Sequence, residues 1–340
     1  MSERVRAGVV GVGHMGRYHV GVYHELPQVD LVAVADLDSD KAAAMAAQYH
    51  TRPLSDYREM LGEVDVVSVA VPTALHYAVA RDCLEAGAHV LVEKPVASSV
   101  EQAEELFDIA RKNERILQIG HVERFNGAVQ ELHKIVREPL LIECRRMGPF
   151  QARVQEDGVV LDLMIHDLDI VLGLVNAPVR TCYAVGLSVH SPREDIASVC
   201  LTFENGCVAN LTASRATQDK VRTLTVTQKD AYIFLDYTEQ DIRVHRRGAS
   251  EHTLTQDQLR YRQEAFIERI FVHKGNPLKL EIRHLLDVAS NGTAAAQRKD
   301  AEQDLKSLRL AFQVLSQIHG QPAPAGPQGN EHGFRESPGR

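Results

Sequence analysis

The sequence lacks a long hydrophobic run and an excess of positive charge. Residues 64–71 form one of its longest apolar stretches, but Asp65 and Ser68 interrupt it, and it is far shorter than the roughly 20 residues that span a bilayer. The net charge is −8, which disfavours nonspecific attraction to nucleic acid or anionic lipid. We therefore expect no membrane span and no nucleic-acid partner.

Cysteine is also scarce. The five cysteines are odd in number and show no Cys-x-x-Cys spacing, so buried thiols in a reducing compartment are the simplest interpretation. The N-terminus runs directly into a strand-like segment, without the apolar region and small-residue cleavage site of a secretory signal. Together these features predict a cytoplasmic protein.

What is present indicates two folded domains. The chain has 340 residues, of which 44% are hydrophobic and 25% are charged, and these are ordinary values for a globular protein of this length. We expect one domain over residues 1–121 and another over residues 122–320. Residues 321–340 are rich in proline and glycine, which predicts a flexible tail.

In the first domain, short β-branched runs alternate with longer amphipathic segments. The expected strands are residues 5–10, 31–35, 64–71, 89–92 and 116–119, and the expected helices are residues 14–26, 39–49, 73–87 and 99–113. Strands that are apolar on both faces and joined by helices predict an α/β Rossmann domain with a doubly wound parallel sheet.

The second domain has a different order of expected helices and strands. It begins with an expected helix over residues 126–137, a strand over 140–147 and a helix over 159–175. Strands follow near residues 179–189, 196–204, 207–214, 221–228, 231–236 and 241–246, and helices near 258–273, 281–296 and 299–318. This order predicts an α+β domain with an open, mainly antiparallel sheet, one face of which is free for solvent or another subunit.

A glycine fingerprint follows the first expected strand. Gly11, Gly13 and Gly16, with His14 and Met15 between them, stand where a dinucleotide-binding turn opens a helix. Such glycines allow the tight turn, the approach of a pyrophosphate to the backbone, and close packing of helix and strand. A glycine turn without a ligand is the alternative interpretation.

Asp36 ends the next strand, about 20 residues further on, where a carboxylate accepts hydrogen bonds from ribose hydroxyls. Leu37 and Asp38 follow it, so a 2′-phosphate would meet two carboxylates and no positive charge. This arrangement predicts NAD in preference to NADP, although Asp36 could equally cap the helix that follows.

Polar residues also follow two later strands. Pro72, Thr73 and His76 come after one, and Glu93 and Lys94 come after another. Ligands of open α/β sheets bind at the carboxyl ends of the strands, so these residues are candidates for the cofactor site. A surface lysine at a strand end is the alternative for Lys94.

The expected helix over residues 159–175 carries a polar stripe. Asp162, His166 and Asp169 are spaced by four and then three residues, which places them on one face of an otherwise apolar helix. Buried polar groups need partners, so the stripe is either a catalytic group or a self-satisfied pair in the core. Asp162 and His166 alone are two ligands short of a closed metal site, and we expect no metal.

These motifs together resemble the Gfo/Idh/MocA oxidoreductase family, which is named after glucose-fructose oxidoreductase, inositol dehydrogenase and rhizopine catabolism proteins. The resemblance spans nearly the whole folded chain and also includes His19 and Gly120-His121. It implies a Rossmann domain, a mixed C-terminal sheet, and homodimers or homotetramers built on the free face of that sheet. It also implies catalytic and substrate-binding roles for Lys94, His166 and Asp162.

Within this family, residues 120–129 and 161–169 look most like the members that oxidise the 3-hydroxyl of UDP-N-acetylglucosamine with NAD. Those members supply a pyridoxal-phosphate aminotransferase on routes to amino sugars of lipid A or other lipopolysaccharide. Gly127 departs from their pattern, which tends to have proline there. The resemblance makes Arg124 and Asn126 candidates for substrate contact, with an ion pair as the alternative for Arg124. Three arginines are candidates for the UDP phosphates: Arg145, Arg146 and Arg153.

Two other functions stay open. A cyclitol or free-sugar dehydrogenase of the same family would use the same Lys94 and His166. A non-catalytic NAD-sensing regulatory protein would use the same fold, but it would not need Lys94, Asp162 and His166 together.

Overall fold

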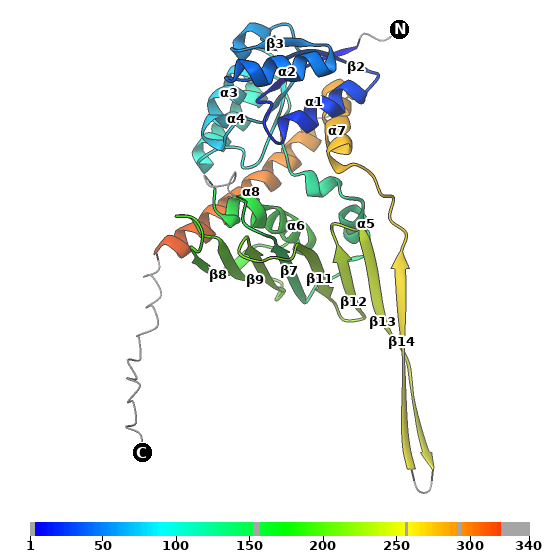
Figure 1. The fold of residues 1–340 in the computed structure, drawn as a ribbon. Helices are drawn as coiled ribbons and strands as arrows, with labels where there is room; N and C mark the ends of the chain where they lie inside the picture. The colour runs from blue at the N-terminus through cyan, green and yellow to red at the C-terminus, as the bar shows by residue number, and fades with distance from the viewer. Residues whose placement is uncertain (1–3, 152–156, 256–257, 292–293, 321–340) are drawn as a thin grey trace, which may run out of the picture.

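The computed structural model describes residues 4–151, 157–255, 258–291 and 294–320, and the expected tail lies outside this part. Two β-sheets dominate the molecule, one in each half of the chain (Figure 1). The fold class predicted from the sequence is confirmed: a parallel Rossmann sheet is followed by an α+β domain with a mixed, mostly antiparallel sheet.

The first sheet has six parallel strands in the order β3-β2-β1-β4-β5-β6. Its strands are β1 (Val5–Val10), β2 (Val29–Ala35), β3 (Arg52–Leu54), β4 (Val66–Val69), β5 (His89–Val92) and β6 (Leu117–Ile119). Its helices are α1 (Gly16–Glu25), α2 (Ser39–Tyr49), the short η1 (Tyr57–Met60), α3 (Thr73–Glu85) and α4 (Val100–Lys112). Strand β3 was not predicted because three residues carry too little periodicity to be recognised.

The second sheet has eight strands in the order β14-β13-β12-β11-β7-β10-β9-β8, with only β7 and β10 parallel among its pairs described. The strands are β7 (Leu141–Met147), β8 (Val179–Leu187), β9 (Ile196–Phe203), β10 (Val208–Ser214), β11 (Val221–Thr227), β12 (Ala231–Asp236), β13 (Asp241–Thr255) and β14 (Gln258–Ile270). The helical elements are η2 (Val122–Phe125), α5 (Gly127–Ile135), η3 (Val160–Met164), α6 (Ile165–Val175), α7 (Pro277–Asn291) and α8 (Ala294–Gly320).

One predicted element is wrong. Residues 258–273 were expected to form a helix, but residues 258–270 form β14, which pairs with β13 along a long antiparallel hairpin (Figure 1). Backbone hydrogen bonds to β13 decide the conformation here, and they depend on a partner strand that local periodicity does not reveal.

Helix α7 returns to the first domain although it lies late in the chain. Leu278, Ile282 and Leu285 pack in the same buried cluster as Val9 and Val20 of the Rossmann domain. Figure 1 shows α7 beside α1. The second half of the chain therefore contributes a helix to the first domain, which a division at residue 121 does not capture.

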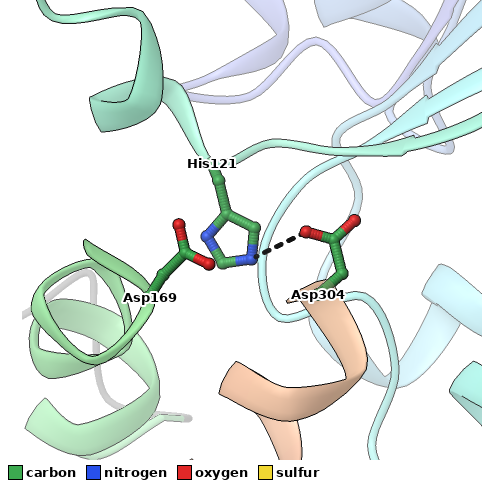
Figure 2. A group of neighbouring side chains, drawn as sticks. All are labelled: His121, Asp169 and Asp304. Atoms are coloured by element: carbon green, nitrogen blue, oxygen red, sulfur yellow. Dashed lines mark ion pairs between the residues drawn. The ribbon is translucent and has the colours of Figure 1, made fainter. Parts of the chain in front are cut away.

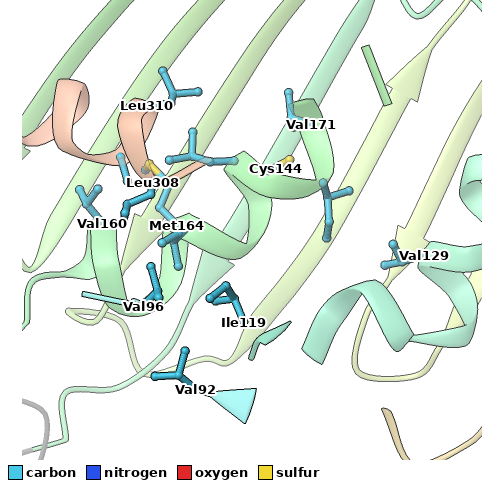
Figure 3. Close-up of a cluster of buried hydrophobic side chains, with 14 of the residues drawn as sticks. Val92, Val96, Ile119, Val129, Cys144, Val160, Met164, Val171, Leu308 and Leu310 are labelled. Carbon is cyan, nitrogen blue, oxygen red and sulfur yellow. The ribbon is translucent and has the colours of Figure 1, made fainter. Parts of the chain in front are cut away.

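A second buried cluster joins the two halves. Figure 3 shows Val92 and Ile119, from strands of the first sheet, in the same cluster as Met164 and Val171 of the second domain and Leu308 of α8. Because protein interiors are close-packed, this shared core fixes the edge of the Rossmann sheet against η3 and α6. Among the helices described, none is both long enough and apolar enough to cross a membrane.

Candidate active site

The glycine turn between β1 and α1 has the geometry that a dinucleotide requires. Gly11 has φ +86°, and a Cβ added to Gly16 would lie against the carbonyl oxygen of Gly11. A Cβ added to Gly13, in contrast, would meet no atom within 4 Å. Gly11 and Gly16 are thus required by the turn itself, whereas Gly13 leaves open space where a pyrophosphate can approach the backbone.

A groove of about 490 Å³ extends from this turn past Asp36 and Pro72. Asp36 accepts hydrogen bonds from the backbone amides of Val12 (2.9 Å) and Asp38 (2.9 Å). Lys41 and Arg58 also line the groove, so the sequence-based expectation that no positive charge lies nearby is corrected. Both cations are ion-paired: Lys41 with Asp38 (3.0 Å), and Arg58 with Asp56 and Asp82.

A separate cavity of about 320 Å³ brings the predicted catalytic residues together. It is lined by His14 and Met15 of the glycine turn, by Glu93 and Lys94 after β5, and by Asp162 and His166. The first four residues come from the Rossmann domain and the last two from the second domain. The cavity therefore lies between the domains, at the carboxyl end of the parallel strands.

Lys94 makes a direct contact across this cavity. Its Nζ donates hydrogen bonds to the backbone oxygen of Asp162 (2.5 Å) and to the Asp162 carboxylate (3.1 Å). Asp162 lies in η3, a single π-helical turn that leads directly into α6. Such turns are frequent at functional sites because they displace side chains from the regular helical face. The predicted stripe is divided: Asp162 and His166 line the cavity, whereas Asp169 is buried and bonds Arg124.

His166 is positioned to act as a neutral base. Burial lowers its pKa well below the ordinary value of 6.5, and the positive charges of Lys94 and Arg146 lower it further. Its Nδ1 is buried and has no hydrogen-bond partner within the part of the chain described, which leaves Nε2 as the nitrogen that can meet a ligand. The imidazole is thus uncharged near neutral pH and able to accept a proton.

A buried hydrogen-bond chain lies behind Lys94. Tyr23 contacts Ser68 (2.9 Å), Ser68 contacts His19 Nδ1 (3.0 Å), and His19 Nε2 contacts Glu93 (2.9 Å). Burial alone would raise the pKa of Glu93, but the hydrogen bond with His19 and the charge of Lys94 hold it below its ordinary value. The chain fixes Glu93 as a carboxylate at the cavity wall.

Two predicted cofactor residues lie behind the site. His76 is buried, and its ring nitrogens lie 2.7 Å and 2.8 Å from the carbonyl oxygens of Pro95 and Val71. It therefore ties together the two loops that follow β4 and β5. Thr73 donates a hydrogen bond to Asp157 of the second domain (2.9 Å). Both residues position the loops that form the site.

Arg124 and Asn126, the predicted substrate contacts, do not line the cavity. The Arg124 guanidinium bonds Asp169 (2.5 and 2.7 Å) and Asp304 (2.6 Å), which is the ion-pair alternative weighed above. Asn126 is 3% exposed, caps α5 by accepting a hydrogen bond from Ala128 N, and donates one to Tyr237 O. Both side chains are occupied by structural contacts.

His121 completes the cluster around these carboxylates. Figure 2 shows its ring between Asp169 and Asp304, with Nε2 3.8 Å from Asp304. Burial lowers the pKa of His121 to about 4, so the ring is neutral and Arg124 supplies the positive charge. This guanidinium bonds both carboxylates, so a cation from the chain itself already engages the two acidic side chains that face His121.

The arginines expected at the phosphates are placed differently. Arg146 is 2% exposed and bonds Asp167 (2.9 and 3.0 Å) and Glu123 (2.8 Å). Arg145 is exposed on the opposite face of β7, and Arg153 lies outside the described residues. Three cavity cations were missed: Arg215, Lys220 and Arg222. The alternation of β11 could have revealed Arg222, because it shares a face with the buried Leu224 and Val226.

Comparison with known proteins agrees with this architecture. Residues 5–121 match the oxidoreductase family with an NAD-binding Rossmann fold, and residues 125–233 match the GFO/IDH/MocA C-terminal domain. The two matches cover the first sheet, strands β7 to β11 of the second sheet, and the elements that carry Lys94, Asp162 and His166.

Individual relatives are similar over much of the chain. UDP-N-acetylglucosamine 3-dehydrogenase of Acidithiobacillus ferrooxidans is 37% identical over 246 residues, which is 72% of this chain and 78% of that protein. Its solved structure superimposes with a TM-score of 0.80 over 93% of this chain and 98% of that chain, at 33% identity. D-glucoside 3-dehydrogenase of Escherichia coli is 33% identical over 195 residues, which is 52% of this chain and 56% of that protein. The chain belongs to the Gfo/Idh/MocA family of oxidoreductases.

Proposed function

We propose that this protein oxidises the 3-hydroxyl of UDP-N-acetylglucosamine to the 3-keto nucleotide sugar, with NAD as the hydride acceptor. The observation that carries the proposal is the meeting of Lys94, Asp162 and His166 in one cavity beside the glycine turn. The two relatives named above act as 3-dehydrogenases, one on a UDP-sugar and one on glucosides. Position 3 of a sugar is therefore the favoured site of oxidation.

The residues of the cavity suit the oxidation of a secondary alcohol. Neutral His166 takes the hydroxyl proton on Nε2. The Lys94 ammonium donates a hydrogen bond to the alcohol oxygen and stabilises the negative charge that develops on it. Asp162 holds the ammonium through the 3.1 Å contact with its carboxylate. Bound NAD supplies the acceptor for the hydride that leaves the carbinol carbon.

The nucleotide groove suits NAD more than NADP. Gly13 leaves space for the pyrophosphate, and Asp36 stands at the groove with both oxygens already held by backbone amides. A 2′-phosphate beside Asp36 would be repelled, because Lys41 is already paired with Asp38, and Arg58 with Asp56 and Asp82. A more than tenfold preference for NAD in kcat/KM is expected, and equal use of NADP would contradict it.

The ketone of the 3-keto product can undergo transamination, because pyridoxal-phosphate aminotransferases convert ketones to amines. We propose that such an enzyme consumes the product on a route to amino sugars of lipopolysaccharide. Physical contact between the two enzymes is not required by this scheme.

The test is the formation of NADH when the purified protein and NAD are incubated with UDP-N-acetylglucosamine, free N-acetylglucosamine, glucosides and inositols. Because oxidation of an alcohol to a ketone is often uphill, each reaction is coupled to an aminotransferase or run in reverse. Among these compounds, only the UDP-sugar is expected to be turned over. Faster turnover of a cyclitol or free sugar, or NAD binding without turnover of any substrate, would contradict the proposal.

A further inference from the structure

Two positively charged side chains on the wall of the catalytic cavity have no assigned partner. Lys220 precedes β11 and is exposed, and Arg222 lies within β11 and is partly buried. Both line the cavity that contains Lys94 and His166. In the part of the chain that the structure describes, no ion pair or side-chain hydrogen bond involves either of them.

The lysine and arginines that also line the cavity form ion pairs with carboxylates. Lys94 is paired with Asp162, Arg146 with Asp167 and Glu123, and Arg215 with Asp195 (2.6 Å). Arg222 stands directly opposite Arg146 in the antiparallel β7–β11 pair. Two neighbouring guanidinium groups repel each other, and burial together with the charge of Arg146 lowers the pKa of Arg222. An anion that enters the cavity would relieve this repulsion.

One structural explanation competes with a ligand. Glu123 and Asp167 together carry one more negative charge than Arg146 supplies, so Arg222 could serve as a distant counter-charge for them. That role predicts a loss of stability when Arg222 is replaced. A ligand role predicts a loss of affinity for an anion without a loss of stability, because replacing Arg222 also removes the repulsion from Arg146.

We propose that Lys220 and Arg222 form a diphosphate-binding subsite for the nucleotide portion of the sugar substrate; this rests on the proposed function. A guanidinium binds phosphate oxygens in a bidentate manner, and a lysine adds a mobile point charge. The subsite explains how an acidic protein holds a substrate with two negative phosphates. It also separates nucleotide sugars from cyclitols and free sugars, which have no group to occupy it.

The diphosphate of NAD is the other source of the same chemistry, because His14 and Met15 of the glycine turn border the same cavity. The experiment therefore measures both ligands. We compare Lys220→Gln, Arg222→Gln and the double variant with wild type, and use Arg283→Gln, an exposed arginine on α7, as a matched control. The readouts are KM and kcat with UDP-N-acetylglucosamine, inhibition by free UDP, the Kd of NADH, and Tm.

If the subsite binds the substrate, Arg222→Gln raises KM for the UDP-sugar and Ki for UDP by about 10- to 100-fold, because a hydrogen bond to a charged group is lost. The double variant raises them further, and kcat stays within about threefold, as for an interaction made equally in ground and transition states. The Kd of NADH and all values for Arg283→Gln stay unchanged. The Tm of the Arg222 variants stays level or rises, because the repulsion from Arg146 is removed.

Three results would overturn the inference. Unchanged KM and Ki in the double variant would show that the two residues do not bind the substrate. A rise in the Kd of NADH equal to the rise in KM would assign the subsite to the cofactor. A lowered Tm with unchanged UDP affinity would show that Arg222 has a structural role. In each case, wild-type turnover of UDP-N-acetylglucosamine would leave the proposed function standing. Failure of wild type to use any nucleotide sugar or to bind UDP would overturn both.

Discussion

Lys94 and His166 come from different domains, and the charge of Lys94 adds to the effect of burial on the protonation of His166. The ammonium adds to the burial that lowers the pKa of His166. An imidazole in this environment is uncharged at neutral pH, which is the state that a general base requires. Acid is therefore expected to inactivate the site only when the pH falls below the lowered pKa of His166, where the imidazole becomes protonated.

The lowered pKa of His166 determines the expected pH profile. With saturating NAD and substrate, kcat should stay level as the pH falls from about 8 to 6.5, and should decline only below the ordinary histidine pKa of 6.5. In a Lys94→Met variant, the acid limb of the residual activity should move to higher pH because one of the lowering charges is gone. A wild-type acid limb centred at or above 6.5 would contradict the assignment of His166 as a neutral base.

Residue types and local spacing made Lys94, Asp162 and His166 candidates, because each lies at an expected strand end or on an expected polar helix face, and the resemblance to the family implied their catalytic roles. They were not sufficient for Arg124, whose partners Asp169 and Asp304 lie far along the chain. Nor did they predict the role of Arg222, because its place opposite Arg146 depends on strand pairing. Long-range ion pairs and sheet register cannot be predicted from the local pattern of a single sequence.

At the scale of elements, the turn between β1 and α1 gives its glycines different tasks. Gly16 has no room for a side chain against the Gly11 backbone, whereas the space beside Gly13 is open. A methyl group at Gly16 therefore strains the fold, and a methyl group at Gly13 obstructs only what binds there.

Replacement of each glycine by alanine tests this difference. Gly13→Ala should fold with a Tm close to that of wild type but raise the Kd of NADH by at least about tenfold, because the methyl group occupies the path of the pyrophosphate. Gly16→Ala should lower both Tm and NADH affinity, since helix and strand must move apart. Thermal unfolding and fluorescence titration with NADH measure the two effects, and unchanged NADH affinity in Gly13→Ala would contradict this account of the turn.

Most helices and strands followed from periodicity, and the exceptions have physical causes. Strand β14 was expected as a helix because its partner β13 cannot be identified from local sequence. Pairing with β13 overrides the local preference of these residues. The polar stripe divides between His166 and Asp169 of α6, because Asp169 bonds Arg124 instead of lining the cavity.

At the scale of the whole molecule, the helices described beside the eight-stranded sheet lie on one of its faces (Figure 1). Tyr183, Val185 and Leu187 of β8 are 64%, 37% and 46% exposed and alternate along the opposite face. Large apolar side chains gathered on one surface indicate a contact with another protein. We propose that this face joins two copies of the chain in a homodimer or homotetramer.

Replacing Tyr183 and Leu187 together by glutamate should shift the protein to a smaller species in light scattering coupled to size-exclusion chromatography. The reason is that charged groups in an apolar interface lose their solvation. Tyr18→Glu, at a tyrosine on α1 that is 46% exposed, serves as the matched control and should not change the mass. A monomeric wild-type protein at micromolar concentration would contradict the proposed contact.

The shared core and the contact of Lys94 with Asp162 hold the two domains so that Lys94 and His166 line one cavity, where we propose that they act on the same substrate hydroxyl. The most direct test is single-turnover hydride transfer, followed as NADH absorbance, in Lys94→Ala and His166→Ala. Each variant is predicted to be slower by about 100-fold or more while the Kd of NADH stays within about twofold. Retention of the wild-type rate by both variants would contradict the account.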